Sequence, residues 1–438
     1  MSQPSRVAEA QDAVVCFLSR GASYGTDLGE VQRIETHCSI VYLAGDRAYK
    51  LKRAIRYASL DYTTRVSRRA ACEAELILNR RTAPEIYLAV RAITCGADGA
   101  LVFDGQGPVL DHVVVMRRFA QSDLFDHMAE NGRLTPALMR TLGEAVARFH
   151  LAAQTMPALG GSDALRRVLA ENAYELGKVA ATLDGAAVGT LASSAAAALD
   201  RLAALLDRRR AEGKVRRGHG DLRLANICLW SGQPTLFDCI EFSEDIGCLD
   251  VLYDLAFLLV DLQMRGLGHL GNVVFNAYLD TAPEQEGLCT LPLFLALRGD
   301  TKLCTGRRGA PPGQPSTGGT AAGAGAATCR GRHRLPRSAA ASAAAAGGND
   351  DHARAELAAL LAAAAAPVPG ARLLRLGIPA QATWREASAV LAAGCSVLIQ
   401  GTFTGETARP AGPLAAQLAV QRIGLWLGRP PTGPDGVA

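Results

Sequence analysis

The sequence predicts an α+β fold in which a small β-rich region precedes a larger helical one. Short apolar runs separated by turn residues occupy residues 38–116, a pattern typical of strands and hairpins. Over residues 135–279, apolar residues instead recur at the spacing of three and four that indicates helices. A Gly- and Ala-rich stretch then separates these regions from a last segment, which we expect to be a partial α/β unit.

The β-rich region is expected to form a small sheet together with two helices. Turn residues at 44–46 separate its first two apolar runs, and this pattern predicts a hairpin. The expected elements are a helix at 10–20, strands at 38–43 and 48–53, a helix at 68–81, and strands at 86–93, 101–103 and 112–116.

The region after residue 135 is expected to be helical. Thr135 followed by Pro136 is a typical helix start, because a threonine caps the first turn and proline fits the first helical position. The apolar residues that follow lie on one helical face, at Leu138, Leu142 and Val146. Further helices are expected at 186–210, 249–262 and 271–279.

The strongest functional signal lies between His219 and Glu241. Asp221 is followed five residues later by Asn226, in the order D-x-x-x-x-N, and Asp238 comes twelve residues further on. Two apolar runs around a turn at 231–234 predict a hairpin that returns Asp238 to the side of Asn226. Phosphoryl transfer requires a carboxylate that orients the attacking hydroxyl, and an amide and a second carboxylate for the metal. Kinase catalytic loops use the same spacing.

These segments resemble the aminoglycoside phosphotransferase family, and in particular its bacterial branch fused to a C-terminal P-loop ATP-binding domain. The resemblance covers residues from about 10 to 298. The matching segments are IETH at 34–37, GDRAYKLKR at 45–53, CEAEL at 72–76, the hairpin at 219–242 and DVLYDLAF at 250–257. The resemblance implies a protein-kinase-like two-lobe fold, with a β-rich N-lobe at 1–118 and a helical C-lobe at 119–298. It also implies ATP and Mg²⁺ as cofactors and a small hydroxylated molecule as acceptor.

The resemblance assigns roles to the residues of the loop. Asp221 would be the catalytic base or would orient the acceptor hydroxyl, and Asn226 and Asp238 would bind Mg²⁺ through hard oxygen ligands. His219 and Asp254 would brace the loop by hydrogen bonding. Glu241 is either a further ligand or a carboxylate of the acceptor pocket, and both alternatives remain open.

A nucleotide site in such a fold needs a strand lysine for the phosphates. Lys50 and Lys52 lie two residues apart on one expected strand, so their side chains point to the same face. Ala48-Tyr49-Lys50 fits the small-x-Lys pattern in which the small residue leaves room for adenine. This favours Lys50, with Lys52 as the alternative.

The strand lysine also needs a glutamate on a helix. Glu73 and Glu75 are both candidates; alignment with the family favours Glu73, and one insertion would transfer the role to Glu75. Residues 116–118 are expected to form the hinge, in which Met116 and Arg118 contact adenine through their backbone.

The C-terminal third lacks the P-loop that the resemblance leads us to expect. The motif G-x-x-x-x-G-K-[ST] does not occur in the chain, and the best residual match, at 347–357, has Arg354 at the lysine position and Ala355 at the hydroxyl position. We expect a low-complexity, disordered linker at 299–346 and a degenerate P-loop kinase-like remnant at 347–438. The composition around 299–350 is also that of GC-rich DNA read out of frame, so compensating frameshifts are an alternative origin.

Composition narrows the remaining classes of function. The net charge of +4 and the absence of a long basic block argue against a nucleic-acid partner. The 11 cysteines form no C-x-x-C pair, and no uncharged apolar run is long enough for a membrane. We therefore expect a cytoplasmic enzyme whose oligomeric state is open. The alternative is a nucleotide-binding pseudokinase or regulatory scaffold without phosphotransfer.

Overall fold

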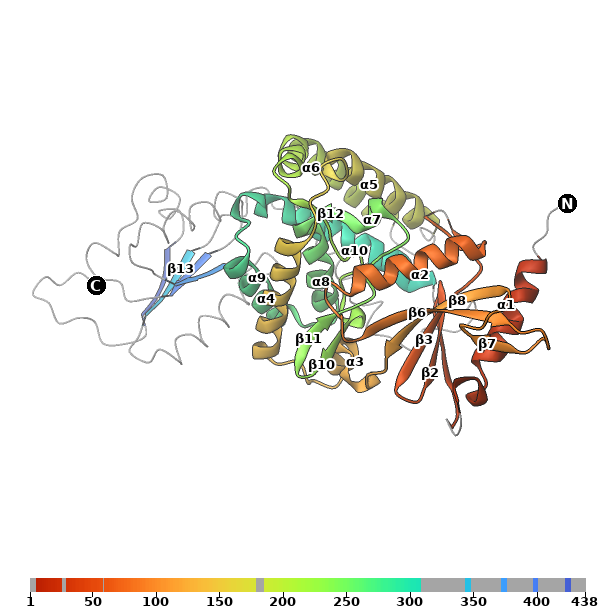
Figure 1. Ribbon diagram of the computed structural model, residues 1–438. Coiled ribbons are helices and arrows are strands. Elements are labelled where there is room, and N and C mark those ends of the chain that lie inside the picture. Colours follow the sequence, from red (N-terminus) through yellow and green to blue (C-terminus); the bar gives the residue numbers. More distant parts are fainter. Residues whose placement is uncertain are drawn as a thin grey trace, which may run out of the picture. The chain divides into compact units, whose positions relative to one another are not determined.

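The protein folds as two compact units in this computed structural model. Unit 1 comprises residues 1–134 and 217–249, and unit 2 comprises residues 135–216 and 250–438. Figure 1 shows the elements along the chain. The described residues are 5–25, 29–57, 59–178, 185–308, 343–347, 372–375, 397–400 and 422–426.

Unit 1 is built on a six-stranded antiparallel sheet, as the strand pattern predicts. The strand order is β1-β2-β3-β8-β6-β7. The strands are β1 (Gln32–Glu35), β2 (Ser39–Ala44), β3 (Arg47–Lys52), β6 (Tyr87–Cys95), β7 (Leu101–Phe103) and β8 (Val109–Arg117). The sequence does not predict β1, because its residues are largely exposed and show no apolar alternation.

The alternation of β3 assigns one helix to each face of the sheet. Tyr49 and Leu51 pack with Val14 and Leu18 of α1 (Ser5–Leu18). The intervening Ala48 belongs instead to the cluster that contains Cys72 of α2 (Arg65–Asn79). Successive strand residues point to opposite faces, so Lys50 and Lys52 share the α2 face with Ala48. The sheet therefore aims both lysines at α2.

A tight hairpin lies between Asn226 and Asp238 in unit 1. Strands β10 (Ile227–Trp230) and β11 (Gln233–Leu236) pair antiparallel, with Ile227 opposite Leu236. Ser231 and Gly232 both have positive φ, 49° and 76°, which is the geometry of a two-residue type I′ turn. The turn is therefore shorter than the predicted 231–234, and Gln233 and Pro234 belong to the strand.

Short elements complete unit 1 and the junctions of the chain. They are η1 (Gly21–Tyr24), β4 (Arg56–Tyr57), β5 (Leu60–Asp61), η2 (Gln121–Asp123), α3 (Phe125–Glu130), β9 (Val215–Arg217), η4 (Leu224–Asn226), α7 (Glu244–Gly247) and β12 (Cys248–Asp250).

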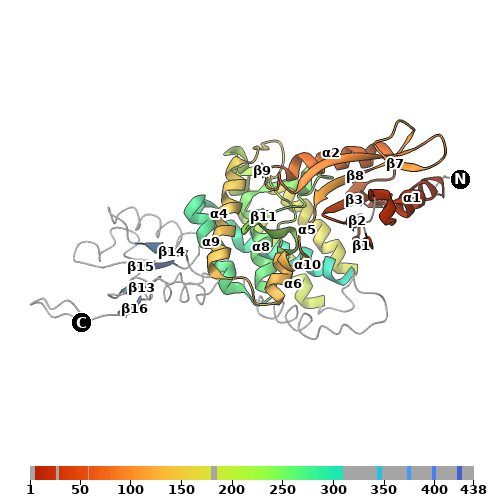
Figure 2. The ribbon, with the colours of Figure 1, turned by 60° about the horizontal axis from the view of Figure 1, so that its bottom comes forward.

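The described part of unit 2 is mostly helical, as predicted. Thr135 caps α4 by accepting a hydrogen bond from the Leu138 amide, with Pro136 in the first turn. Helix α4 packs along α9 (Figure 2), and a Cβ at Gly143 would lie 2.5 Å from the Val274 carbonyl oxygen. Glycine is therefore required at this crossing. The helices are α4 (Pro136–Ala152), α5 (Gly161–Lys178), α6 (Gly185–Ala211), α8 (Val251–Met264), α9 (Gly268–Thr281), η5 (Gln285–Thr290) and α10 (Leu291–Arg308).

The C-terminal third contributes four short parallel strands. Their order is β14-β15-β13-β16, and they are β13 (Ala343–Gly347), β14 (Arg372–Arg375), β15 (Val397–Gln400) and β16 (Arg422–Trp426). Helix α10 continues to Arg308 and β13 begins at Ala343, so the disordered linker predicted at 299–346 is wrong at both of its ends. The rest of that linker, 309–342, lies outside the described residues. Apart from Gly347, the residual motif at 347–357 lies outside the described residues. Among the described residues, no helix combines the length and apolar character needed to cross a membrane.

Candidate active site

Asp221, Asn226 and Asp238 meet at the open end of the β10–β11 hairpin. The Phe237 amide donates to the Asn226 carbonyl oxygen at 3.0 Å, so the residue before Asp238 is bonded directly to Asn226. The Asn226 side-chain Nδ2 donates to the carbonyl oxygen and to Oδ2 of Asp221, at 2.9 and 2.8 Å. The predicted spacing therefore brings the three residues together through local hydrogen bonds.

The backbone around Asp221 is held by its neighbours on both sides. Gly220 has φ of 83°, and a Cβ there would lie 2.9 Å from Ile240 Cγ1, so this position requires glycine. The buried His219 ring contacts the Phe237 carbonyl oxygen through Nε2 at 2.9 Å, and the Ile240 amide donates to the His219 carbonyl oxygen at 2.9 Å. In the structure, His219 braces the loop, as expected.

Asp254, the other predicted brace, lies in unit 2. Its Oδ2 is 3.2 Å from Nε2 of the buried His150, whose Nδ1 contacts the Tyr278 hydroxyl at 2.9 Å. This polar group joins α8, α4 and α9, so these contacts of Asp254 stabilise the helical unit.

Asp238 carries both a strained backbone and an ion pair. Its φ of 64° lies in the left-handed region, which is uncommon for a residue with a side chain and concentrates at functional sites. Its Oδ1 is 2.5 Å from Lys50 Nζ. Burial acts to raise the Asp238 pKa, but the attraction of Lys50 outweighs it and the pKa falls to about 2. Asp238 is therefore ionised at neutral pH, as a metal ligand must be.

Lys50 pairs with Glu75, which corrects the glutamate that the sequence favours. Lys50 Nζ lies 2.8 Å from Glu75 Oε1, and the Glu75 side chain is 0% exposed. Glu73 instead points to the surface and pairs with Arg69 at 2.8 Å. Positions 73 and 75 are about 200° apart around a helix, so only one of them can face the sheet. Burial acts to lower the Lys50 pKa, but Asp238 and Glu75 together raise it well above its ordinary value.

Lys52 occupies a second, closed position in the same network. Its Nζ forms ion pairs with Glu75 Oε2 and with Glu241 Oε1, and the Tyr62 hydroxyl donates to Glu241 Oε1 at 2.5 Å. The Glu241 side chain is 5% exposed. Glu241 is therefore the buried partner of Lys52 here, which differs from both roles that the sequence leaves open.

The predicted hinge residues end strand β8. Met116 is buried, pairs in register with Ala48 and with Tyr87, and shares an apolar cluster with Phe237. The Arg118 amide donates to the Asp46 carbonyl oxygen at 2.9 Å. An adenine contact through the Arg118 N–H would therefore require this bond to break.

Sequence reasoning missed Arg223 as part of the site. Arg223 Nε donates to Asp221 Oδ2 at 3.0 Å, so that oxygen accepts from both Arg223 and Asn226. The signal was the position of an arginine two residues after Asp221, close enough for a local contact. Tyr87 was also missed: its hydroxyl accepts from the Asp238 amide at 3.2 Å and lies 3.4 Å from Glu75 Oε1.

The donor set of the loop fits a nucleotide-bound Mg²⁺. Among the described residues, no cluster of three or more His, Cys, Asp or Glu side chains could hold a metal by itself. Mg²⁺ does not need one, since it commonly takes one or two protein oxygens together with waters and substrate phosphates. Asn226 and Asp238 supply such oxygens, because the Nδ2 protons of Asn226 already point at Asp221.

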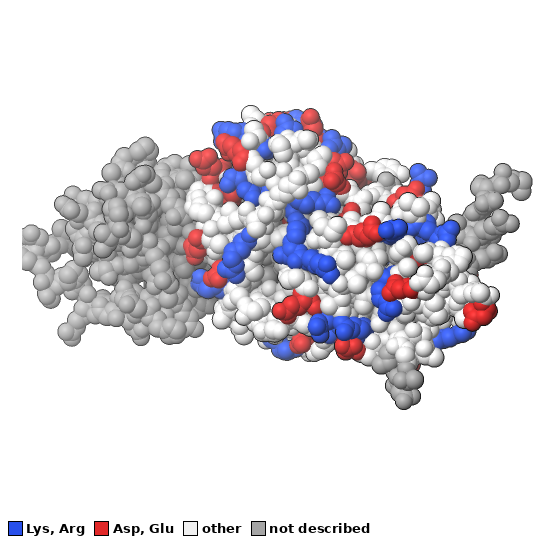
Figure 3. All heavy atoms as spheres, viewed as in Figure 1, with Lys and Arg blue, Asp and Glu red and all other residues white. Residues whose placement is uncertain are grey.

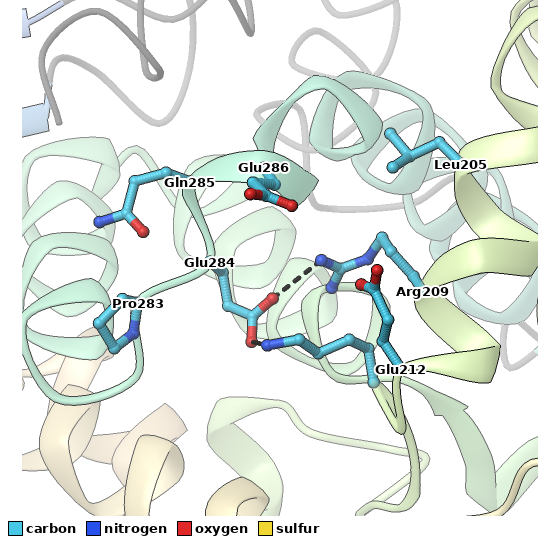
Figure 4. A pocket seen from close by; sticks show the side chains of 8 residues that line it. Leu205, Arg209, Glu212, Pro283, Glu284, Gln285 and Glu286 are labelled. Carbon is cyan, nitrogen blue, oxygen red and sulfur yellow. Dashed lines mark hydrogen bonds and ion pairs between the residues drawn. The ribbon is translucent and has the colours of Figure 1, made fainter. Parts of the chain in front are cut away.

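Unit 2 contains a separate charged pocket of about 180 Å³ (Figure 4). Arg209 forms a two-pronged ion pair with Asp250, at 2.7 and 2.8 Å, and also contacts Glu284 at 2.9 Å. Lys214 contacts the other Glu284 oxygen at 2.6 Å. The two cations of the pocket, Arg209 and Lys214, are thus already neutralised by protein carboxylates. Their ion pairs with Glu284 join α6 to the segment before η5. The pocket is lined by Leu205, Arg209, Glu212, Lys214, Pro283, Glu284, Gln285 and Glu286.

Comparison with known proteins identifies one family and several relatives. The family model described as the phosphotransferase enzyme family matches residues 47–288, more than half of the chain. Uncharacterised proteins of Mycobacterium tuberculosis and Mycobacterium bovis are each 32% identical over 257 residues, which are 57% of this chain and 50% of the relative. The chain thus spans about half the length of the curated relatives it matches.

Solved structures show a more distant likeness. A choline/ethanolamine kinase family protein from Mesorhizobium loti is 15% identical, with a TM-score of 0.41 over 75% of this chain and 96% of that chain. An ethanolamine kinase of Plasmodium vivax is 12% identical, with a TM-score of 0.42 over 75% of this chain and 95% of that chain. Likeness at this level carries no argument about substrate.

Proposed function

The chain belongs to the phosphotransferase enzyme family, and we propose that it transfers the terminal phosphoryl group of ATP to a hydroxyl of a small molecule. One observation carries the proposal. Asn226 is hydrogen-bonded to Asp221 and to the amide of Phe237, the residue before Asp238, and Asp238 forms an ion pair with Lys50 of the buried Lys50–Glu75 pair. These are the groups that phosphoryl transfer requires.

Asp221 would hold the acceptor. Arg223 and Asn226 both donate to Oδ2, so we assign Oδ1 as the oxygen that accepts the hydrogen bond of the acceptor hydroxyl. A carboxylate fixed in this way orients the nucleophile and takes its proton as the new bond forms. The same two donors hold the Asp221 carboxylate in one orientation in this structure.

Lys50 and the two metal ligands would hold the nucleotide. Lys50 would bind phosphate oxygens while Glu75 keeps its side chain in place, and Asn226 and Asp238 would hold Mg²⁺. The bound ion would neutralise the negative charge that develops on the phosphates. Asp238 is already ionised at neutral pH, so no proton has to leave before it binds a cation.

The distribution of charge on the surface supports a soluble acceptor of low molecular weight. On the face shown in Figure 3, basic and acidic side chains are interspersed, which does not favour a polyanion as acceptor. A nucleotide-binding scaffold without phosphotransfer is less well supported, because Asp221, Asn226 and Asp238 are all intact. We place the enzyme in the cytoplasm, where ATP is available.

We also propose that the C-terminal segment predicted at 347–438, together with β13 (Ala343–Gly347), is a degenerate remnant of a nucleotide-binding domain. Strand β13 ends at Gly347, where the residual motif begins, and the neighbouring strands run parallel to it. The lobe boundary at 118 remains part of this proposal, and the end of the helical lobe moves from 298 to Arg308, where α10 ends. ATP would then have one working site, in residues 1–298.

The test is Mg²⁺-dependent phosphate transfer or ATP hydrolysis by the full chain and by Asp221→Asn, which is nearly isosteric. We expect turnover to fall by about 10²- to 10⁴-fold, the usual contribution of a positioned acid or base. Asp98→Asn, at an exposed turn, is the matched control and keeps parental turnover. Equal turnover in the Asp221 and Asp98 variants would remove the assignment.

A further inference from the structure

The strand that carries Lys50 carries a second buried lysine that phosphoryl transfer does not call for. Lys52 has a side chain only 2% exposed, and it contacts two carboxylates, Glu75 and Glu241. Glu75 is therefore a bridge, with Oε1 on Lys50 and Oε2 on Lys52. A buried charge without a partner of opposite charge is strongly unfavourable. The second buried lysine therefore needs a second buried carboxylate, which Glu241 supplies.

Lys52 is sealed away from the position where phosphates would lie. Its ammonium lies 5.5 Å from the centre of the Tyr62 ring, and the Tyr62 hydroxyl donates to Glu241. Tyr62 itself packs with Leu60, Ala71 and Phe242. Lys50 differs in this respect, because it contacts Asp238, whose side chain is 39% exposed. The structure thus assigns different environments to two lysines that the sequence could only rank.

The second pair also fixes the segment that follows Asp238. Glu241, at the end of segment 238–241, forms an ion pair with Lys52. Within the segment, the Cys239 amide donates to Asn79 Oδ1 of α2 at 2.9 Å. Asn79 in turn donates to the Glu75 carbonyl oxygen at 2.9 Å. Helix α2 therefore holds this segment at two points, one of them through Lys52.

We propose that Lys52, anchored by Glu241 and Tyr62, is a positioning residue that keeps Glu75 in place when Lys50 engages the phosphates of a nucleotide. This inference rests on the proposed function. When a phosphate group forms an ion pair with Lys50, the attraction between Lys50 and Glu75 would be weakened. Lys52 retains its ion pair with Oε2 throughout, so Glu75 does not turn away. The Lys50–Glu75 geometry is then maintained without a separate activating contact.

The first test observes the two lysines directly, without relying on activity. The chain contains five lysines, so ¹³Cε-lysine labelling gives a short NMR spectrum in which Lys50→Met and Lys52→Met identify the two signals. We expect Mg²⁺–ADP to shift the Lys50 signal and to leave the Lys52 signal in place. A Lys52 shift as large as that of Lys50 would make Lys52 a phosphate ligand and overturn the proposal. If neither signal moves, the nucleotide site itself is wrong.

The second test separates positioning from stability. Lys52→Met should lower the kcat of ATP turnover by about 10- to 100-fold, as losses of supporting contacts commonly do, with the Kd for Mg²⁺–ADP changed less than about threefold. Glu241→Gln, nearly isosteric, should act in the same direction to a smaller extent. The matched control is Arg69→Met, which removes the cation of the exposed ion pair with Glu73; both residues lie on α2, the helix that carries Glu75.

These measurements are made on the full chain well below the unfolding midpoint of each variant. A purely structural role for Lys52 lowers that midpoint but leaves kcat per folded molecule unchanged. The proposal is therefore overturned if Lys52→Met and Glu241→Gln both keep the kcat of Arg69→Met. If Lys52→Met does not fold, Glu241→Gln decides the question. Parental protein that binds Mg²⁺–ADP but gives no turnover would contradict the proposed function separately, because the NMR test would still distinguish the lysines.

Discussion

Replacing Glu75 by glutamine tests the helix face on which the candidate site depends. The substitution keeps the size of the side chain and removes a charge that is 0% exposed and contacts both Lys50 and Lys52. Removing one member of a buried ion pair costs about 3 to 5 kcal/mol. Each lysine keeps one carboxylate here, Asp238 or Glu241, so we expect the lower end, about 3 kcal/mol.

The matched control is Glu73→Gln, two residues away on the same helix. Glu73 forms an exposed pair with Arg69, and such pairs between positions four apart contribute about 0.3 to 0.5 kcal/mol. Thermal unfolding followed by fluorescence is the assay. For a cooperative unit of this size, about 3 kcal/mol corresponds to a fall of roughly 6 to 12 °C in the midpoint, against about 1 to 2 °C for the control. Equal shifts, or a larger one for Glu73→Gln, would refute the assignment of Glu75.

Three further predictions concern stability and the loop. Glu284→Gln should destabilise the protein by about 3 kcal/mol because Glu284 pairs with two cations, whereas the exposed Glu286→Gln should change little; chemical denaturation measures both. Gly220→Ala should lower ATP turnover by more than tenfold, since a positive φ and contact with a neighbouring side chain both oppose a Cβ there; a variant with parental kcat would contradict this reading. Asp238 and Glu241 have lowered pKa values in the folded state, so each contributes stability above the ordinary pKa of its carboxyl group, about 4, and loses it as the pH falls through the folded value, which is about 2 for Asp238; acid titration of unfolding should show a shallower decline for Glu241→Gln than for the parent.

Local features of the site follow well from the sequence. Two apolar runs around a turn predict the hairpin between Asn226 and Asp238, and the structure has it, because hydrogen bonds between neighbouring strands and one tight turn decide it. Likewise, the period of two along β3 is enough to place Lys50 and Lys52 on one face. Both inferences use geometry confined to short stretches of chain.

The choice of glutamate on α2 was harder because the buried face of this helix is partly polar. Its buried residues are Arg68, Ala71, Cys72, Glu75 and Asn79, which recur at helical spacing. A search for apolar residues overlooks this stripe, since only two of the five are apolar. The buried partner of Arg68, Asp111, lies on β8, and such a pair between distant segments leaves no local pattern.

The Lys52–Glu241 pair could not be predicted for the same reason. The two residues are 189 positions apart and meet only after β3 and the segment that follows β11 come together. The sequence shows a second lysine and a second acid near the motifs but gives no reason to pair them. Arg223 is a different case, because a contact two residues from Asp221 is local, and testing the reach of each basic residue near the loop would have found it.

We infer that Asp238, held by Lys50 at the end of the hairpin, belongs to one working phosphotransfer site. The most direct measurement is Mg²⁺-dependent transfer from γ-labelled ATP by the full chain, with a panel of sugars, amino alcohols and aminoglycosides as acceptors, for the parent and for Asp238→Asn. We predict transfer or hydrolysis by the parent and a loss of at least about 100-fold in the variant. A parent that neither binds nor turns over Mg²⁺–ATP, or a variant as active as the parent, would contradict the claim.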